Sequence, residues 1–417
     1  MLSTIGSLGD LYPVLSIARA LEDRGTEVRL ALTPEDCDIA RRWGLLATPV
    51  GPSQADVCAA LGMSRDEVAA SVLQDPGPLI SQALMPLLPD MARTIATLCD
   101  GATCVAGTSF ALGAALAAEM TDLPFVPLIL QPMMLMSAED PAHGHAHRFA
   151  LHDRTGPLAH LWNRAFIGAV HGVFRLRHGR QLSRVRRDLG LNRQRATPIL
   201  DHDATMPVRL GLWSEHFAPK PKDAPEGLHL VGFPPAPEGD LPAEVVGWIA
   251  EGPPPLVVTL GSIAQRLGRE NFWRQAIDMA RQMGLRAVLL HGAAEVPQGL
   301  DILALPYAAH APLFPMAAAV VHHGGIGSTA EAMRAGRPQL ILPVGGDQPD
   351  NAMRVKRAGL AEVIPIAAFT GQRGAAELGS LLNRFDYAKA AALADTITEE
   401  DGAAIAARHL QDIALRA

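Results

Sequence analysis

The chain has 417 residues, enough for two domains of ordinary size. Hydrophobic residues make up 48 % of it and charged residues 19 %, a balance typical of a well-buried α/β enzyme and unlike that of a disordered protein. The formal net charge of −7 argues against a general nucleic-acid-binding role.

Other features of the composition indicate where the protein works. Its four cysteines show neither paired metal-ligand spacing nor the density of a disulfide framework, so we expect reduced thiols. No apolar run approaches the roughly eighteen residues of a membrane span, and no signal peptide is evident. We therefore expect a soluble cytoplasmic protein, with peripheral contact to a membrane left open.

The start of the chain predicts a strand, a glycine turn, a helix and a second strand. The turn runs from Gly6 to Gly9, and apolar residues recur at helical spacing over positions 14–21. Gly25 ends the helix, and residues 28–32 form the next strand. The turn lacks the Gly-x-Gly-x-x-Gly pattern, so no nicotinamide dinucleotide fingerprint is present.

The next strands are expected at residues 103–107 and 125–130, with a helix over 110–120 between them. Thr108 or Ser109 would cap that helix. Three methionines follow the second strand, and flexible thioether side chains suit an adaptable apolar pocket. Either this group forms the wall of a site for a lipophilic or aromatic alcohol, or it is ordinary core packing. These residues are Met133, Met134 and Met136.

Two further stretches of the first half are unusual. His143, His145 and His147 alternate beside a proline and a glycine, and we expect a polar loop there in preference to a metal site. Residues 163–195 are helical and strongly basic, with some apolar residues. This helix either touches anionic lipid or a lipidic acceptor, or has a solvated face, which is the interpretation we favour.

Residues 210–214 are expected to form the last strand of the first half, and a zone with seven prolines between 219 and 242 follows. Prolines at this density indicate a stiff interdomain linker. Strands at 256–260 and 287–291 flank a helix over 271–283 and resume the α/β alternation. The rest of the chain is helical over 352–358, 375–384 and 388–415.

The most informative stretch runs from Tyr307 to Asn351. A buried strand over 317–321 leads into a glycine-rich turn, and Ser328 and Thr329 are good caps for the helix that follows over 330–335. Gly336 ends that helix, and residues 339–344 form the next strand. A glycine turn at a helix N-terminus is an anion site, most often for phosphate.

Polar side chains surround this turn. His323 can add a hydrogen-bond donor or a positive charge, and Glu331 could accept from ribose hydroxyls. Asp347 and Gln348 follow the next strand and therefore lie at the same carboxyl edge of a parallel sheet, where open α/β sheets bind ligands. Two carboxylates, an amide and a diphosphate cradle on one edge suit a nucleotide-sugar.

These residues resemble the donor-binding signature of the NDP-sugar-dependent glycosyltransferases of the GT-B fold, the UDP-glycosyltransferase family. The nearest resemblance is to bacterial rhamnosyl- and glucosyltransferases of lipids, sterols, polyketides and polyphenols. That signature is an aromatic residue, His-x-Gly-x-x-Ser/Thr-Thr-x-Glu, Gly-x-Pro and Asp-Gln-x-x-Asn. The matching residues are Tyr307, His323, Gly325, Ser328, Thr329, Glu331, Gly336, Pro338, Asp347, Gln348 and Asn351.

The resemblance implies a role for each matched residue. Tyr307 would stack on the base, Glu331 would hold the ribose, and Asp347 with Gln348 would hold the sugar hydroxyls. His323 and the turn from Gly325 through Gly327, Ser328 and Thr329 would hold the diphosphate. Ser262, His310, His322 and Asn351 complete the expected donor-binding set.

The opening Gly-Ser-x-Gly-Asp also resembles this family, in which the position of Asp10 often holds a histidine that acts as the general base. Asp10 is therefore our candidate base, and Ser7 and Gly9 are candidate acceptor-binding residues. Asp10 lies near a helix N-terminus, which lowers a carboxylate pKa and weakens the base, so burial would have to offset that effect. The alternative is that Asp10 only caps the helix.

The resemblance implies an α/β protein of the GT-B fold, with two facing Rossmann-like domains and a cleft between them. We expect an acceptor-binding domain over 1–218, a linker over 219–242, a nucleotide-sugar-binding domain over 243–385, and a C-terminal helix over 386–417 that packs back on the first domain. Oligomeric state stays open.

The expected activity is inverting, metal-independent transfer of rhamnose or glucose from a dTDP-sugar or UDP-sugar to a hydroxyl of a small lipophilic or aromatic acceptor. The nucleotide-sugar is a co-substrate, and no resident cofactor is expected. Two alternatives are a nucleotide-sugar epimerase on the same fold and a non-catalytic nucleotide-sugar-binding partner protein.

Overall fold

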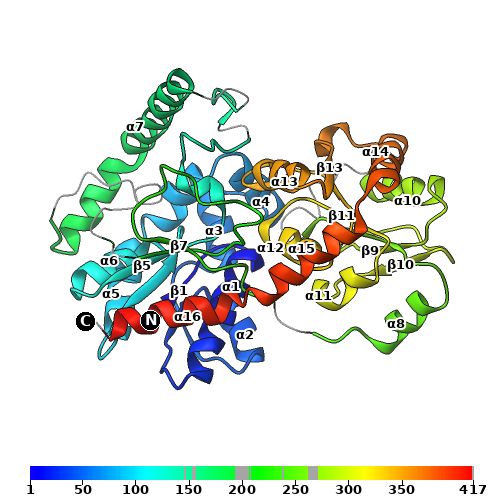
Figure 1. Ribbon diagram of the computed structural model, residues 1–417. Helices are drawn as coiled ribbons and strands as arrows, with labels where there is room; N and C mark the ends of the chain where they lie inside the picture. Colours follow the sequence, from blue (N-terminus) through cyan, green and yellow to red (C-terminus); the bar gives the residue numbers. More distant parts are fainter. Residues whose placement is uncertain are drawn as a thin grey trace. The chain divides into compact units, whose positions relative to one another are not determined.

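The computed structural model describes residues 1–144, 147–152, 156–192, 206, 208–236, 239–261 and 271–415. The chain divides into two compact units. Unit 1 comprises Met1–Pro235 and Asp401–Ala417, and unit 2 comprises Ala236–Glu400. Each unit is built on its own parallel sheet (Figure 1).

Unit 1 holds a seven-stranded sheet in the order β3-β2-β1-β4-β5-β6-β7, and every pairing is parallel. The order reverses between β1 and β4, which defines the switch point of a doubly wound sheet. The strands are β1 (Leu2–Ser3), β2 (Leu30–Leu32), β3 (Ala47–Pro49), β4 (Val105–Thr108), β5 (Phe125–Ile129), β6 (Arg209–Gly211) and β7 (Leu228–Leu230).

Helices cover both faces of this sheet. On one face α1 (Leu8–Asp23) buries Leu11, Val14 and Leu15 against the strands, and α16 (Gly402–Ala414) packs beside it in the same apolar cluster. On the other face α5 (Leu88–Leu98) and α6 (Leu112–Met120) pack together in a second cluster. The remaining helices are α2 (Pro34–Arg42), α3 (Gln54–Leu61), α4 (Arg65–Gln74), the π-helix η1 (Leu79–Leu84), the 3₁₀ helix η2 (Pro132–Leu135) and α7 (Pro157–Asp188).

Two expectations about the ends of unit 1 were wrong. The strand β7 forms at Leu228–Leu230, inside the predicted proline-rich linker, so the strand near residue 210 is not the last one. Flanking prolines are compatible with β7 because it lies at the edge of the sheet, where one side needs no ladder partner. The predicted single helix over 388–415 is divided between α15 (Tyr387–Glu399) in unit 2 and α16 in unit 1.

Unit 2 holds a six-stranded parallel sheet in the order β10-β9-β8-β11-β12-β13. Its order reverses between β8 and β11, so the switch point lies where these two strands end. The strands are β8 (Leu256–Thr259), β9 (Ala287–Leu290), β10 (Ile302–Leu305), β11 (Ala319–His322), β12 (Gln339–Ile341) and β13 (Ala361–Val363).

The helix after β11 begins earlier than expected. This helix, α12 (Ile326–Arg334), has Gly325 as its N-cap, so Ser328 and Thr329 lie inside its first turn and do not cap it. The N-cap was predicted at the wrong residue. Gly325 has an extended backbone conformation and takes the N-cap position before Ser328 and Thr329, whose side chains would also suit it. The other helices of unit 2 are α8 (Ala243–Ala250), α10 (Phe272–Gln282), α11 (His310–Leu313), the 3₁₀ helices η4 (Phe314–Met316) and η5 (Ile366–Ala368), α13 (Gln348–Arg357) and α14 (Gly371–Arg384).

Within the described ranges, no helix combines the length and the apolar character that crossing a membrane requires.

Candidate active site

The expected site residues lie at the two switch points. In unit 1, β1 leads into residues 4–10, and β4 ends at Thr108 beside them. In unit 2, β8 leads to Gly261, and β11 leads to His323 and the start of α12. Both places are the carboxyl ends of adjacent parallel strands, where loops diverge and a ligand can reach the backbone.

The imidazole of His323 is held between two glycines. A Cβ atom at Gly261 would lie 2.4 Å from Cε1 of His323, and one at Gly325 would lie 2.4 Å from its Nε2. Gly261 also has φ +66°, a left-handed conformation that glycine adopts without strain. Because neither glycine has a side chain, the ring packs directly against backbone from β8 and from the α12 turn.

His323 is neutral in the free protein. Only 8 % of the residue is exposed, and burial lowers the pKa of the imidazole to about 3, with smaller contributions from His322 and His310. The sequence alone allowed His323 to act as a hydrogen-bond donor or as a positive charge. The lowered pKa favours a neutral ring at neutral pH. No partner among the described residues bonds to its Nδ1 or to Oγ1 of buried Thr329.

The N-terminus of α12 faces the same turn without a side-chain cap. Its N-cap is Gly325, which has no side chain to accept from the first amides of the helix. Gly327 and Ser328 follow within the first turn, and Ser328 is buried. Uncapped amides and the positive end of the helix dipole lie at this turn, and together they can bind an anion.

Glu331 is buried on α12 and already has protein partners. Arg334 donates to its Oε1 at 2.5 Å, and the backbone N–H of Ala236 donates to the same atom at 3.4 Å. Both carboxyl contacts thus end on Oε1, and Oε2 is the atom that a ribose hydroxyl would reach. Arg334 was not predicted to belong to the site. The signal that could have indicated it is its i+3 spacing from Glu331, which is that of a helical ion pair.

The Asp-Gln-x-x-Asn segment is held together internally. The amide of Asn351 donates to the Asp347 carboxylate at 2.7 Å and to the carbonyl of Gly324 at 3.0 Å. Oε1 of Gln348 accepts from the N–H of Val344 at 2.8 Å. Asn351 is fully buried, so it ties the Asp347 loop to the glycine turn and is a positioning residue.

His322 is fully buried and uses both ring nitrogens within the protein. Its Nδ1 accepts from the N–H of Gly324 at 3.2 Å, so its Nε2 carries the proton and donates to Oε1 of Gln339 at 3.0 Å. We therefore assign His322 a positioning role. The role of Gln339 was not predicted, because it begins a stretch, residues 339–344, that is otherwise apolar.

The two remaining donor-side residues lie near the end of β10. His310 starts α11 and stacks on Phe314 with ring centroids 4.5 Å apart, and burial lowers its pKa to about 4. Tyr307 is 63 % exposed, so its ring is available to stack on a planar group.

On unit 1, Asp10 forms a capping box with Ser7 at the start of α1. The backbone N–H and the hydroxyl of Ser7 donate to Oδ2 of Asp10 at 2.7 Å and 2.8 Å, while Oγ of Ser7 accepts from the N–H of Gly9 at 3.2 Å. Burial raises the pKa of the carboxyl above its ordinary value, against the opposing effect of these two bonds. Asp10 is therefore both a helix cap and a carboxylate of raised basicity.

The Asp10 loop is held in place by three residues, Thr4, Gly6 and Thr108, and none of them was predicted to do so. Thr4 and Thr108 share a buried hydroxyl–hydroxyl bond of 2.8 Å, which joins β1 to β4. The expectation that Thr108 or Ser109 caps α6 was wrong, because the N-cap is Ala111. A Cβ atom at Gly6 would lie 2.4 Å from the Asp10 carboxyl, so the Asp10 side chain fits only against glycine there.

The methionine group is divided. Met134 packs against the apolar cluster around Leu112 and Leu182, which favours core packing for that residue. Met133 and Met136 are partly exposed just beyond the end of β5, where a wall of an acceptor site remains a prediction. Met136 holds a left-handed conformation with φ 49°, uncommon for a residue with a side chain.

Some expected features fall outside the described residues, namely Ser262, His145 and the end of the basic stretch beyond residue 192. Of the alternating histidines, His143 stacks on His152 with ring centroids 4.0 Å apart. No group of three or more metal-ligating side chains occurs in the part of the chain that is described.

Comparisons with known proteins agree with this geometry. Residues 283–409 match the family described as erythromycin biosynthesis protein CIII-like, C-terminal domain. The chain is 28 % identical to the vancomycin aglycone glucosyltransferase of Amycolatopsis orientalis, over 100 % of this chain and 98 % of that protein. It is 29 % identical to the O-mycaminosyltylonolide 6-deoxyallosyltransferase of Streptomyces fradiae, over 90 % of this chain and 88 % of that protein.

Among solved structures, the glycosyltransferase VinC in complex with dTDP superposes with a TM-score of 0.69 at 21 % identity, covering 100 % of this chain and 99 % of that one. The chain is a glycosyltransferase of the GT-B fold. This glycosyltransferase transfers a sugar from a nucleotide-sugar, and an epimerase is not favoured.

Proposed function

We propose that this glycosyltransferase moves rhamnose or glucose from a dTDP-sugar or UDP-sugar to a hydroxyl of a small lipophilic or aromatic acceptor, with inversion at the anomeric carbon. The observation that carries the donor half is the uncapped N-terminus of α12 at the switch point between β8 and β11, with buried His323 two residues before its N-cap. The relatives support the acceptor class, because their names are those of enzymes acting on the vancomycin aglycone and on O-mycaminosyltylonolide.

In the proposed mechanism Asp10 is the general base. The acceptor oxygen attacks the anomeric carbon, its proton passes to Oδ1 of Asp10, and the bond from the anomeric carbon to the diphosphate oxygen breaks. A single displacement of this kind inverts the configuration. The raised pKa of Asp10 favours the proton transfer, because a more basic carboxylate holds the proton more strongly.

The leaving diphosphate would be stabilised at the N-terminus of α12. The amides of Ile326, Gly327 and Ser328 have no acceptor in the preceding turn, so they can donate to phosphate oxygens as charge develops there. The neutral imidazole of His323 would donate one more hydrogen bond, and an adjacent diphosphate would raise its pKa. No metal or resident cofactor enters this scheme, which is part of the proposal.

The nucleoside and sugar would be held by the groups around this anion site. Tyr307 would stack on the pyrimidine, and Oε2 of Glu331 would accept from the ribose. Asp347 would accept from sugar hydroxyls, and the side-chain amide of Gln348 would donate to the sugar, because its Oε1 is already engaged by the loop.

The test is nucleotide binding followed by product analysis. Calorimetric titration with dTDP, UDP and ADP should show binding of at least one pyrimidine diphosphate and none of ADP. The matching dTDP- or UDP-sugars are then incubated with a panel of aromatic and lipophilic alcohols, and the anomeric configuration of the product is read by NMR. Retained configuration, or no pyrimidine diphosphate binding by a folded sample, would refute the proposal.

The same samples test the two alternatives. An epimerase converts the nucleotide-sugar when no acceptor is present, so donor incubated alone should return unchanged apart from slow hydrolysis. A non-catalytic binding protein would bind the nucleotide and leave both donor and acceptor unchanged over the whole panel.

We also propose that the protein contacts membranes peripherally. A lipophilic acceptor concentrates in or near a bilayer, and an enzyme held at that surface would meet it there.

A further inference from the structure

The amino-terminal part of α7 carries an unusual concentration of exposed apolar side chains. Six of the thirteen large hydrophobic residues exposed in the described chain lie between positions 149 and 176. Leu158 is 83 % exposed and Leu176 is 84 % exposed. Figure 1 shows α7 running out from the body of unit 1. The six residues are Phe149, Leu158, Leu161, Trp162, Val173 and Leu176.

Five of these side chains belong to α7 and lie on one face of the helix. The positions 158, 161, 162, 165, 169, 173 and 176 recur at helical spacing, and all of them are exposed. The opposite face carries Ala159, Asn163 and His178, which are buried against unit 1. The outer face therefore has no packing partner among the residues that the structure describes.

Hydrogen bonds hold the exposed tip in shape. The indole N–H of Trp162 donates to the carbonyl of Phe149 at 2.8 Å. Buried Asn163 accepts from the N–H of Leu151 at 2.9 Å and donates to the carbonyl of Ala138 at 3.1 Å. These bonds keep the exposed side chains of Phe149 and Trp162 together on one surface.

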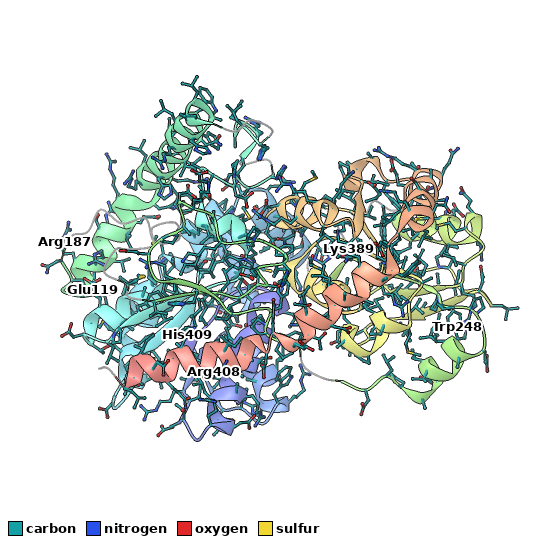
Figure 2. The ribbon with its side chains drawn as sticks, in the orientation of Figure 1. Glu119, Arg187, Trp248, Lys389, Arg408 and His409 are labelled. Atoms are coloured by element: carbon teal, nitrogen blue, oxygen red, sulfur yellow. The ribbon has the colours of Figure 1, made fainter. Side chains whose placement is uncertain are left out.

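The charge on this helix is opposite to that of the whole protein. Its sequence holds seven arginines against a single acidic residue, Asp188, while the complete chain has a net charge of −7. Arg177 pairs with Asp75, and Arg186 pairs with Glu119 at the carboxyl end of α7. Figure 2 labels Glu119 and Arg187 at this end of the helix. The other arginines are exposed and form no ion pair with a described residue: Arg164, Arg175, Arg180, Arg184 and Arg187.

We infer that the outer face of α7 is a docking surface for an anionic lipid bilayer. Leucine and tryptophan side chains enter the boundary between headgroups and acyl chains, and flanking arginines bind lipid phosphates. A second copy of the chain fits this face less well, because the pairing would bring Arg164 and Arg175 against arginines. The inference deepens the membrane contact proposed above and does not depend on the transfer reaction.

The test is co-sedimentation of the full chain with vesicles. Phosphatidylcholine vesicles containing about one third phosphatidylglycerol should bind the protein, and vesicles of phosphatidylcholine alone should not. Binding should weaken as the salt concentration rises towards about 0.5 M, because the attraction is partly electrostatic. The double variant Leu161→Glu/Trp162→Glu should bind at least about tenfold more weakly.

Matched controls separate this surface from general stickiness. Leu46 and Leu300 are exposed leucines elsewhere, so Leu46→Glu/Leu300→Glu should bind like the wild type. Replacing Arg164 and Arg175 by Gln should weaken binding by roughly fivefold for each lost charge, while replacing exposed Arg41 and Arg93 should not.

Three results would overturn the inference. One is the absence of wild-type binding to anionic vesicles. Another is binding that the α7 variants leave unchanged. The third is a dimer in sedimentation velocity that Leu161→Glu/Trp162→Glu converts to monomer, which would make this face a subunit interface. Sugar transfer to a dissolved acceptor should survive in every variant, so a failure here is distinguishable from a failure of the proposed function.

Discussion

Asp10 and Asp56 occupy the same position in the same kind of helix cap, and their pKa values shift in opposite directions. Each carboxylate accepts from the backbone N–H and the hydroxyl of the serine three residues earlier, Ser7 or Ser53. Asp56 is exposed, and the bonds from Ser53 lower its pKa. Burial outweighs the same bonds at Asp10 and raises its pKa. Burial, and not the cap, therefore distinguishes the candidate base.

Asp10→Asn should abolish most of the turnover and leave nucleotide affinity unchanged. The amide keeps the shape of the carboxyl but cannot take a proton, and general-base catalysis typically contributes about 10²- to 10⁴-fold. The measurement is kcat with a saturating nucleotide-sugar, beside a calorimetric titration with the nucleoside diphosphate.

Asp56→Asn is the matched control for this experiment. It removes the carboxylate from an equivalent capping box on α3, so it should reproduce any loss of stability that comes from the cap alone. Equal kcat values for the two variants would show that Asp10 only caps α1.

The pH dependence of catalysis should report the same carboxyl. The base must be ionised, so kcat/KM should fall as the pH drops through the raised pKa of Asp10. Ser7→Ala removes the hydroxyl bond that favours the ionised form, which raises the pKa further and should move the acid limb to higher pH. The equivalent change Ser53→Ala should leave the limb in place, and an unmoved limb in Ser7→Ala would count against the assignment.

The spacing of residues 307–351 was sufficient to predict the fold of this part of the chain, while the donor site expected there stays a prediction. Strand, glycine turn and helix follow one another there, and local signals decide each of them. The state of His323 could not be predicted, because its burial depends on Gly261, which β8 brings to it from outside the motif. In the same way, the bond between Thr4 and Thr108 beside the Asp10 loop could not be predicted, because these residues are 104 positions apart.

The buried ion pair on α13 should be important for the stability of unit 2. Nε of Arg354 donates to Oδ2 of Asp350 at 2.8 Å, and the two side chains are 4 % and 0 % exposed. Arg354→Met leaves a buried carboxylate without its cation, which typically costs about 3–5 kcal/mol. Urea unfolding of the variant should show a loss of this size.

The exposed pair of Arg41 and Asp38 provides the comparison, since both side chains are 70 % exposed. Arg41→Met should cost less than about 1 kcal/mol, because water screens the lost attraction. Similar losses in both variants would mean that Asp350 is not as isolated from solvent as its burial indicates.

Gly325→Ala should weaken nucleotide binding by moving His323. Gly325 has φ −60°, which alanine adopts without strain, so the change acts through contact. The new methyl group would lie 2.4 Å from Nε2 of His323, and the ring can yield only towards Gly261 or out of the site. We expect dTDP or UDP affinity to fall at least tenfold, roughly the value of one good hydrogen bond to an anion.

His323→Ala should give a similar loss, and the double variant should add little to either, because both changes remove one interaction. Gly379→Ala is the control: that glycine lies in α14 with open space around it, so alanine should leave affinity unchanged. Full losses that add in the double variant would show that Gly325 and His323 act independently.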